Sequence, residues 1–379
     1  MHDVLDTAAV RERIDQLPRA PVGFYPTPFH QLHNMPKKLG INLYMKREDL
    51  AGPSAISGSK VRLSEFILGQ AVKDGYTHII THGAHLTNSG LQFAAAAAVS
   101  GLTPMLYLTR DLTHHGKLDE YRGNLLLSKI MDVETQFINS KGRGQWMVNE
   151  GNKIITSSTE GHRAIIVRAG GAHPLAFVAH ALTFVEMLEQ SKNAGVELDY
   201  IYHTAGTGTA LPGMLAGKLL TRSPVKIRSI TINAYGDKAG DVSFIGIQTI
   251  VDRVKGIFER LEVLPPSDDV IRAEINFDQG FIGEDYGVPS TESISAIQEL
   301  ARAEGIFLGP VYTGKGFAGL LHHVRSGKVP VGSNVAFLHT GDAANLFESS
   351  AVVGEIVDGI KSDWLPGWYL EGADPPDFI

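Results

Sequence analysis

The sequence predicts an α/β fold of two three-layer domains, each built on a mainly parallel sheet. Short runs rich in β-branched and aromatic residues alternate along the chain with segments that carry apolar residues at helical spacing. Alternation of this kind is typical of parallel sheets covered by helices. The length of 379 residues suits about two domains. The apolar fraction of 43% is enough to give each domain a core.

The first half of the chain contains several predicted elements. A short polar helix ends before Pro18, and the prolines between Pro21 and Pro28 keep the next residues extended. The following elements are the strand Ile41–Met45, a loop at Ala51–Ser59, a helix that starts at Lys60, the strand His78–Thr81, a loop at Gly83–Asn88, the helix Leu91–Val99, the strand Pro104–Leu108, the helix Asp119–Ile130 and the strand Ala164–Arg168. The polar segment Gly142–Gly161 is predicted to be a mobile loop.

The second half continues the alternation between helices and strands. Its predicted elements are the helix Leu175–Gln190, the strand Tyr200–His203, the helix Leu211–Leu220, the strand Ile227–Ile232, the helix Thr291–Ala303 and the strand Val335–His339.

The composition excludes several classes of function. The net charge is −7 and there is no basic block, which argues against nucleic acid or an anionic membrane as a partner. No run of about 18 apolar residues predicts a membrane span. Residues 1–20 lack the apolar core of a signal peptide. The absence of cysteine excludes disulfides and a cysteine nucleophile. We therefore expect a cytoplasmic protein.

A glycine- and threonine-rich loop follows the strand that begins at Tyr200. Its residues are Gly206, Thr207, Gly208, Thr209 and Ala210. Backbone N–H groups of small residues can close around an anion, and the start of the next helix favours negative charge. A tight turn without a ligand is an equally good interpretation of the loop alone. If it binds phosphate, a cofactor with a single phosphate fits better than a nucleotide. No lysine follows the second glycine, and the loop lies late in the chain for a dinucleotide fold.

Lys60 stands at the end of a glycine- and serine-rich loop and opens a helix. Most lysines are solvated. The alternative is an amine held against an aldehyde as a Schiff base. Spacing alone favours the solvated lysine.

Several segments together resemble a known family. Lys46–Asp49 followed by Gly58–Arg62 resembles the lysine signature of fold-type II pyridoxal-phosphate (PLP) enzymes, which are similar to the β-subunit of tryptophan synthase. The chain is most similar to the family of aminocyclopropane-carboxylate deaminases and D-cysteine desulfhydrases, from Pro26 to Phe347. The other matching segments are Thr87-Asn88-Ser89, Gly170-Gly171, Gly206–Met214, Tyr286–Pro289, Pro310–Gly316 and His339-Thr340-Gly341.

This resemblance implies a cofactor and a domain organisation. It implies PLP in the cleft between a large domain (residues 1–60 with 180–379) and a smaller mobile domain (residues 61–179). It also implies a homodimer that acts on a small amino acid.

The resemblance further implies the roles of individual residues. Lys60 would form the Schiff base with the cofactor and act as a base at the substrate Cα. Asn88 would contact the phenolic oxygen of the cofactor, and Thr340, or else Thr313, its ring nitrogen. The loop from Gly206 to Ala210 would bind the phosphate. The implied catalytic partners of Lys60 are Thr87, Tyr286 and Tyr312.

The chain also departs from the family pattern. Thr87 and Ser89 stand where the family has serine and histidine, Thr313 stands where the deaminases have glutamate, and Asp342 and Asn345 replace glycine and small residues. A neutral threonine at the ring nitrogen would leave the ring a weaker electron sink. We therefore expect β-elimination, as in D-cysteine desulfhydrase, with release of ammonia and a 2-oxo acid. The alternatives are β-replacement, ring opening as in the deaminases, and a binding protein without catalysis.

The 15 histidines do not predict a metal site. His78 and His82 would lie well apart on one face of a strand, and the adjacent pairs at 114–115 and 322–323 would point apart. No helix has the zinc pattern His-Glu-x-x-His, and no Gly-x-Ser-x-Gly elbow indicates a serine hydrolase.

Overall fold

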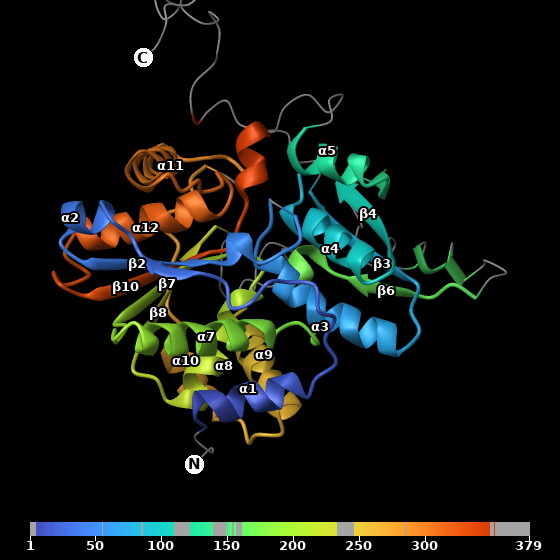
Figure 1. The fold of residues 1–379 in the computed structure, drawn as a ribbon, viewed down its shortest axis with the longest axis horizontal. Helices are drawn as coiled ribbons and strands as arrows, with labels where there is room; N and C mark the ends of the chain where they lie inside the picture. Colours follow the sequence, from blue (N-terminus) through green and yellow to red (C-terminus); the bar gives the residue numbers. More distant parts are fainter. Residues whose placement is uncertain are drawn as a thin grey trace, which may run out of the picture.

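The computed structural model describes residues 5–54, 56–84, 86–109, 122–138, 149, 151–153, 155–156, 161–232, 246–284, 286–348 and 352. Two mainly parallel sheets organise these residues, one of six strands and one of four. Helices cover both sheets, so the predicted α/β fold class is confirmed (Figure 1).

The larger sheet has the strand order β1-β2-β10-β7-β8-β9. Its strands are β1 (Phe29–Gln31), β2 (Asn42–Arg47), β7 (Tyr200–Ala205), β8 (Lys226–Thr231), β9 (Phe277–Asp278) and β10 (Asn334–His339). Only β1 runs antiparallel to its neighbour. In the centre, β10 pairs with β2, where His339 lies opposite Arg47, and also with β7. The sheet therefore joins an early segment of the chain to one almost 300 residues later.

Helices cover both faces of this sheet. One face carries α2 (Met35–Leu39), α11 (Thr291–Glu304) and α12 (Thr313–Arg325). The other carries α1 (Thr7–Asp15), α7 (Ala179–Asn193), α8 (Ala210–Thr221), α9 (Ile247–Arg260) and α10 (Asp268–Glu274). In β10, Val335 and Phe337 pack into the first layer, and Ala336 and Leu338 into the second. A strand buried on both faces needs such a continuous apolar run.

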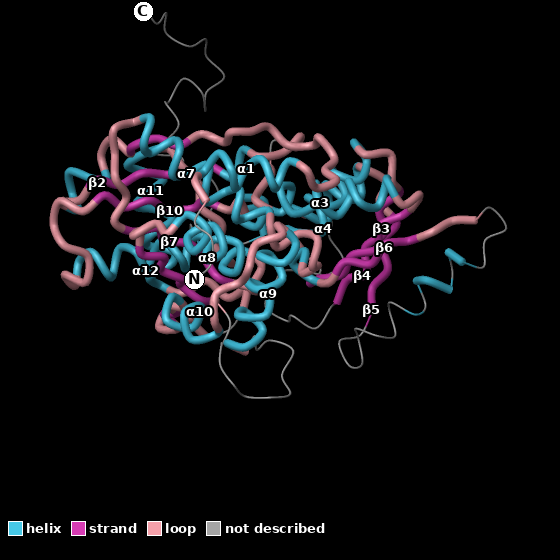
Figure 2. Tube along the Cα trace, turned by 90° about the horizontal axis from the view of Figure 1, so that it is seen from below, coloured by secondary structure: helices cyan, strands magenta, loops and turns pink. Residues whose placement is uncertain are grey.

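The smaller sheet has the order β5-β4-β3-β6, and all its strands are parallel. They are β3 (His78–Ala84), β4 (Thr103–Thr109), β5 (Glu134–Ile138) and β6 (Ala164–Val167). Its helices are α3 (Lys60–Lys73), α4 (Asn88–Val99) and α5 (Gly123–Ile130). Figure 2 shows this sheet at one end of the molecule, apart from β2, β7 and β10. Because α3 contacts both α4 and α7, it connects the two parts.

Some element boundaries differ from the predicted ones. β3 extends to Ala84, into the predicted loop, and α7 starts at Ala179 because the preceding residues form turns. The predicted helix at 119–130 is described only from residue 122, and most of the predicted mobile loop at 142–161 lies outside the described residues.

The sequence did not predict α9 or α12. In α12, Gly316 and Gly319 lower the helix propensity. Both glycines are needed for packing. A Cβ on Gly316 would lie 2.0 Å from Thr204 Oγ1, and one on Gly319 would lie 2.6 Å from a side-chain carbon of Ile230. Among the helices that the structure describes, none is long and apolar enough to cross a membrane.

Candidate active site

One pocket between the two sheets gathers the residues predicted for the site, except Thr313, the alternative to Thr340. Its walls include Lys60 at the start of α3, residues 86–89 at the start of α4, and the loop between β7 and α8. From the C-terminal part of the chain it receives Tyr286, Tyr312, Thr340, Asp342 and Asn345. Parallel strands end at the same edge of a sheet, and binding sites of such folds lie outside those ends.

Lys60 is held by its backbone and points its amine at the phosphate loop. Gly58 forms an isolated β-bridge with Gly341, and the Ser59 N–H donates to the Thr340 carbonyl over 3.1 Å. The Lys60 amine donates to Thr209 Oγ1 over 2.9 Å. Burial lowers the pKa of Lys60 to about 8. A substantial share of this amine is therefore neutral and nucleophilic near physiological pH.

A buried ionic cluster lies behind Lys60. Arg62 donates to both carboxylate oxygens of Glu48, over 2.7 and 2.8 Å, and pairs with Glu186 over 2.8 Å. Lys46 binds the other oxygen of Glu186 over 2.8 Å. All four side chains are buried. The cluster joins β2, α3 and α7, so it fixes the start of the helix that carries Lys60.

The loop between β7 and α8 is shaped to receive an anion. Gly208 adopts the left-handed conformation, with φ of 66°. Gly170 packs so closely on the loop that a Cβ there would lie 2.2 Å from Thr207 Oγ1. From α9, Arg253 donates to the carbonyls of Thr207 and Gly208 over 3.1 and 2.6 Å. These two hydrogen bonds fix the orientation of the peptide units that join residues 207, 208 and 209.

The start of α4 supplies a second polar wall. Thr87 is the N-cap, and its hydroxyl accepts from the Gly90 N–H over 3.1 Å and lies 3.1 Å from Ser89 Oγ. Asn88 is buried, and its Oδ1 has no hydrogen-bond partner among the described residues. A buried amide oxygen without a partner is costly, so it indicates a bound group.

Tyr286 and Tyr312 form a pair. Their hydroxyls are hydrogen bonded to each other, and their rings meet edge to face with centroids 5.9 Å apart. Burial raises the pKa of Tyr286 to about 12. Burial also raises the pKa of Tyr312 well above its ordinary value, with further contributions from Tyr286 and Asp342. Both phenols are therefore neutral proton donors at physiological pH.

The two threonines predicted as alternatives for the ring nitrogen differ in position. Thr340 lines the pocket. The Thr313 hydroxyl accepts from the Gly309 N–H over 2.8 Å and donates to the Gly341 carbonyl over 3.2 Å. Its proton is already donated within the protein, so Thr340 is the better placed of the two to meet a bound group.

Asp342 and Arg253 had no predicted role, although both act on the site. The Asp342 carboxylate accepts from the N–H groups of Val311 and Tyr312 over 3.2 and 3.0 Å. Burial raises its pKa to about 7, although these hydrogen bonds and one from Asn345 lower it. The sequence feature that could have pointed to Asp342 is its place directly after the His339-Thr340-Gly341 segment. Nothing in the sequence around Arg253 indicated a contact with a loop 45 residues earlier.

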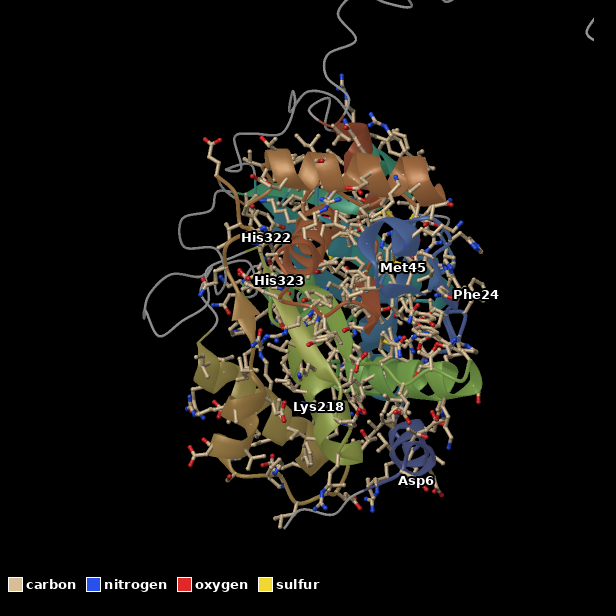
Figure 3. All side chains as sticks on the ribbon, turned by 90° about the vertical axis from the view of Figure 1, so that its left-hand side faces the viewer. Asp6, Phe24, Met45, Lys218, His322 and His323 are labelled. Carbon is tan, nitrogen blue, oxygen red and sulfur yellow. The ribbon has the colours of Figure 1, made fainter. Side chains whose placement is uncertain are left out.

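Among the described residues, no group of three or more His, Asp or Glu side chains is arranged to hold a metal ion. The rings of His78 and His162 lie 4.8 Å apart at an interplanar angle of 50°, and His82 accepts from the Ala169 N–H over 3.2 Å. His322 is exposed, whereas His323 is buried and bonds to Asp278 over 2.7 Å. Figure 3 labels both histidines. The predicted pair at 114–115 lies outside the described residues.

The pocket fits a phosphorylated aldehyde cofactor. It combines a low-pKa amine at Lys60, a cradle of N–H groups and hydroxyls from Thr207 to Thr209, and the unpartnered oxygen of Asn88. The aldehyde carbon of such a cofactor would meet the Lys60 amine, its phosphate would meet the Thr207–Thr209 loop, and a polar substituent on its ring would meet Asn88.

Comparisons with known proteins agree with this chemistry. A family model described as "Pyridoxal-phosphate dependent enzyme" matches residues 21–341. The chain is 29% identical over 344 residues to a 1-aminocyclopropane-1-carboxylate (ACC) deaminase of Variovorax paradoxus (strain S110), covering 86% of this chain and 95% of that relative. The crystal structure of an ACC deaminase homologue superposes with a TM-score of 0.77 at 29% identity, over 89% of this chain and 96% of that one. O-ureido-L-serine synthase, at 17% identity and a TM-score of 0.61 over 93% and 98% of the two chains, shares the fold. The chain belongs to the family of pyridoxal-phosphate dependent enzymes of fold type II.

Proposed function

We propose that this enzyme is a PLP-dependent deaminase that converts a small amino acid into a 2-oxo acid and ammonia. The supporting observation is that the Lys60 amine, the Thr207–Thr209 loop and the Tyr286–Tyr312 pair line one pocket. The ACC deaminase relative, which covers most of the chain, supports the same class of reaction.

In this proposal the cofactor occupies the pocket in one orientation. The loop from Gly206 to Ala210 and the start of α8 bind its phosphate. Asn88 bonds its phenolic oxygen, and the Thr340 hydroxyl faces its ring nitrogen. When bound, PLP accepts electrons from the Cα of an attached amino acid.

The protein side chains then handle protons and the substrate. With a pKa of about 8, Lys60 can act as a base towards the substrate and can return the proton later. In cysteine or serine it would remove the Cα proton, whereas 1-aminocyclopropane-1-carboxylate has no Cα proton, so there it would act on a proton of a ring methylene. The hydroxyls of Thr87 and Ser89, with the N–H groups at the start of α4, bind the substrate carboxylate. The neutral phenol of Tyr286 or Tyr312 donates a proton to the departing group.

Two substrate classes fit this arrangement. Ring opening of 1-aminocyclopropane-1-carboxylate is supported by the relative that carries that name. β-Elimination from D-cysteine is supported by the neutral Thr340 in the pocket, because a threonine does not keep the ring nitrogen protonated as a carboxylate would.

The decisive experiment is a substrate panel. The purified enzyme, loaded with PLP, is given 1-aminocyclopropane-1-carboxylate and both enantiomers of cysteine and serine, and ammonia and 2-oxo acid are measured. The Lys60→Ala variant is the control and should be inactive. Formation of a new amino acid only when a thiol or amine is added would identify a β-replacement synthase instead. If no amino acid in the panel is converted although the cofactor is bound, the deaminase proposal is wrong.

We also propose the domain division given above, with residues 61–179 as the smaller domain, and a homodimer in the cytoplasm. Light scattering of the purified protein tests the dimer.

A further inference from the structure

A chain of polar side chains runs from the wall of the pocket at Asp342 and Asn345 to α5 beside the smaller sheet. Asp342 follows β10, Asn345 belongs to the short helix η3 (Ala343–Glu348), and Asn124 belongs to α5 beside the smaller sheet. Asn345 Nδ2 donates to Asp342 Oδ1. Asn124 Nδ2 donates to Asn345 Oδ1 over 3.1 Å and to the Leu86 carbonyl over 2.9 Å. The residues Asp342, Asn345 and Asn124 are 1%, 3% and 1% exposed.

The direction of every hydrogen bond in this bridge is fixed by its ends. A backbone carbonyl such as that of Leu86 only accepts hydrogen bonds, and so does Asp342 when it is ionised, which requires a pH above its pKa of about 7. The NH₂ group of Asn124 must therefore face the Leu86 carbonyl, and the NH₂ group of Asn345 must face the Asp342 carboxylate. The remaining oxygen of Asn345 then accepts from Asn124. Only an acceptor at position 342 satisfies this arrangement.

Both ends of the bridge hold backbone that lines the pocket. At one end, the second oxygen of Asp342 accepts from the N–H groups of Val311 and Tyr312. Gly309 packs against the same carboxylate so closely that a Cβ there would lie 2.3 Å from Asp342 Oδ2. At the other end, Leu86 immediately precedes Thr87, the N-cap of α4.

We propose that Asp342 is a positioning residue that, through Asn345 and Asn124, sets the distance between Tyr312 and the Thr87–Ser89 wall. The backbone of Asp342 adopts the left-handed conformation, with φ of 87°, which is unfavourable for a residue other than glycine. A glycine would suit this backbone better, so the conformation alone does not account for an aspartate here. The inference depends on the proposed function in one respect, which is that Tyr312 and Thr87 act on the substrate.

The polarity of the bridge allows a sharp test. In Asp342→Asn the new NH₂ group faces the NH₂ group of Asn345. If the side-chain amides of Asn345 and Asn124 rotate to relieve this clash, the Leu86 carbonyl loses its donor. One buried hydrogen bond of the bridge is therefore lost in either arrangement. Asn345→Asp places two carboxylates together. The double variant, which combines Asp342→Asn with Asn345→Asp, restores every bond. In it the new amide at position 342 donates to the new carboxylate at position 345, which still accepts from Asn124.

Kinetics with the amino acid found in the substrate panel, measured well above the Asp342 pKa of about 7 so that this carboxyl is ionised, give the first readout. Each single variant should lower kcat about tenfold or more, a loss of the size expected for one buried hydrogen bond. The double variant should return to within about threefold of the parent enzyme. Single variants as active as the parent, or a double variant no better than the singles, would overturn the proposal.

Hydrogen–deuterium exchange of the cofactor-free protein gives a readout that needs no activity. Amides of residues 86–90 and 309–313 should exchange faster in the single variants and recover in the double variant. If the enzyme converts no amino acid, the deaminase proposal fails. The exchange measurement still tests whether the bridge through Asp342, Asn345 and Asn124 holds the two backbone segments. Unchanged exchange in both segments of the single variants would contradict it.

Discussion

The amine of Lys60 donates a hydrogen bond to the hydroxyl of Thr209, 149 residues further along the chain. This contact links the group proposed to bind the cofactor aldehyde to the loop proposed to bind its phosphate. The lysine is therefore oriented towards the cofactor site by the protein alone, and the entropy of ordering its side chain is already lost before the cofactor binds.

Replacement of Lys60 by alanine should abolish covalent attachment of PLP while leaving the fold intact. Reduction with borohydride followed by mass spectrometry should find a pyridoxyl adduct on the parent enzyme and none on Lys60→Ala. Lys73→Ala, at the exposed end of the same helix, is the matched control and should keep the adduct. An adduct of equal yield on Lys60→Ala would rule out Lys60 as the site of attachment.

The rate of PLP attachment to the cofactor-free enzyme should rise with pH through about 8. Burial lowers the pKa of Lys60 to about 8, and only the neutral amine attacks an aldehyde. An unburied lysine would show its rise near about 10.4 instead. Stopped-flow absorbance at a series of pH values measures this midpoint, and a midpoint typical of an unburied lysine would show that Lys60 is solvated in the free protein.

Arg253→Met should weaken PLP binding by about tenfold to a hundredfold, since charge-assisted hydrogen bonds contribute about 1.5–3 kcal/mol. The substitution removes the two bonds that hold the carbonyls of Thr207 and Gly208. Lys255→Met on the same helix is the control, because Lys255 pairs with Asp268 and does not contact the loop. Equilibrium dialysis measures both affinities, and equal affinities would mean that Arg253 does not shape the loop.

Arg62→Met should lower the free energy of unfolding by about 3–5 kcal/mol, because it leaves buried carboxylates at Glu48 and Glu186 without their main partner. Arg325→Met removes a surface pair with Glu299 and should change the free energy by less than about 1 kcal/mol. Urea denaturation followed by circular dichroism compares the two variants. Losses of similar size would contradict a special role for the buried cluster.

Asp342 should make the enzyme less stable as the pH rises from about 4 to about 7. Burial raises the pKa of this carboxyl to about 7 in the folded protein, against about 3.9 when unfolded. The unfolded state then binds fewer protons than the folded state between these values, so stability falls with pH across the window and is level above it. Relative to Asp342→Asn, the parent should lose on the order of 3–5 kcal/mol over this range. Parallel urea titrations at several pH values give the difference, and a pH-independent difference would show that the carboxyl has an ordinary pKa.

Much of the fold followed from local patterns. β10, which is buried on both faces, carries a continuous apolar run from Val335 to Leu338, and several of the predicted helices carry apolar residues at regular spacing. α12 was not predicted, because its glycines weaken the helix signal and their purpose lies in contacts with Thr204 and Ile230 from other elements. Local propensity contains no information about such contacts.

The residues of the candidate site were predicted from family motifs more than from the properties of the individual side chains. Lys60 alone gave no reason to choose a reactive amine over a solvated one, and the burial that lowers its pKa is a property of the folded chain. The bridge through Asp342, Asn345 and Asn124 was not predicted, although two of these residues stood out as departures from the family. Its direction depends on a carbonyl at Leu86 that only the fold brings near.

The position of β10 has a consequence for synthesis on the ribosome. This strand separates β2 from β7 in the sheet, and Thr340 directly after it holds the backbone before Lys60. Until residues 334–341 have emerged, β2 and β7 have no common neighbour and both expose an unpaired edge, a hazard for aggregation. The smaller sheet, by contrast, uses strands from residues 78–167 alone and can form early. The nascent chain should therefore form the pocket that contains Lys60 in one late step. Cofactor added to a ribosome-bound chain that ends before β10 should not be retained.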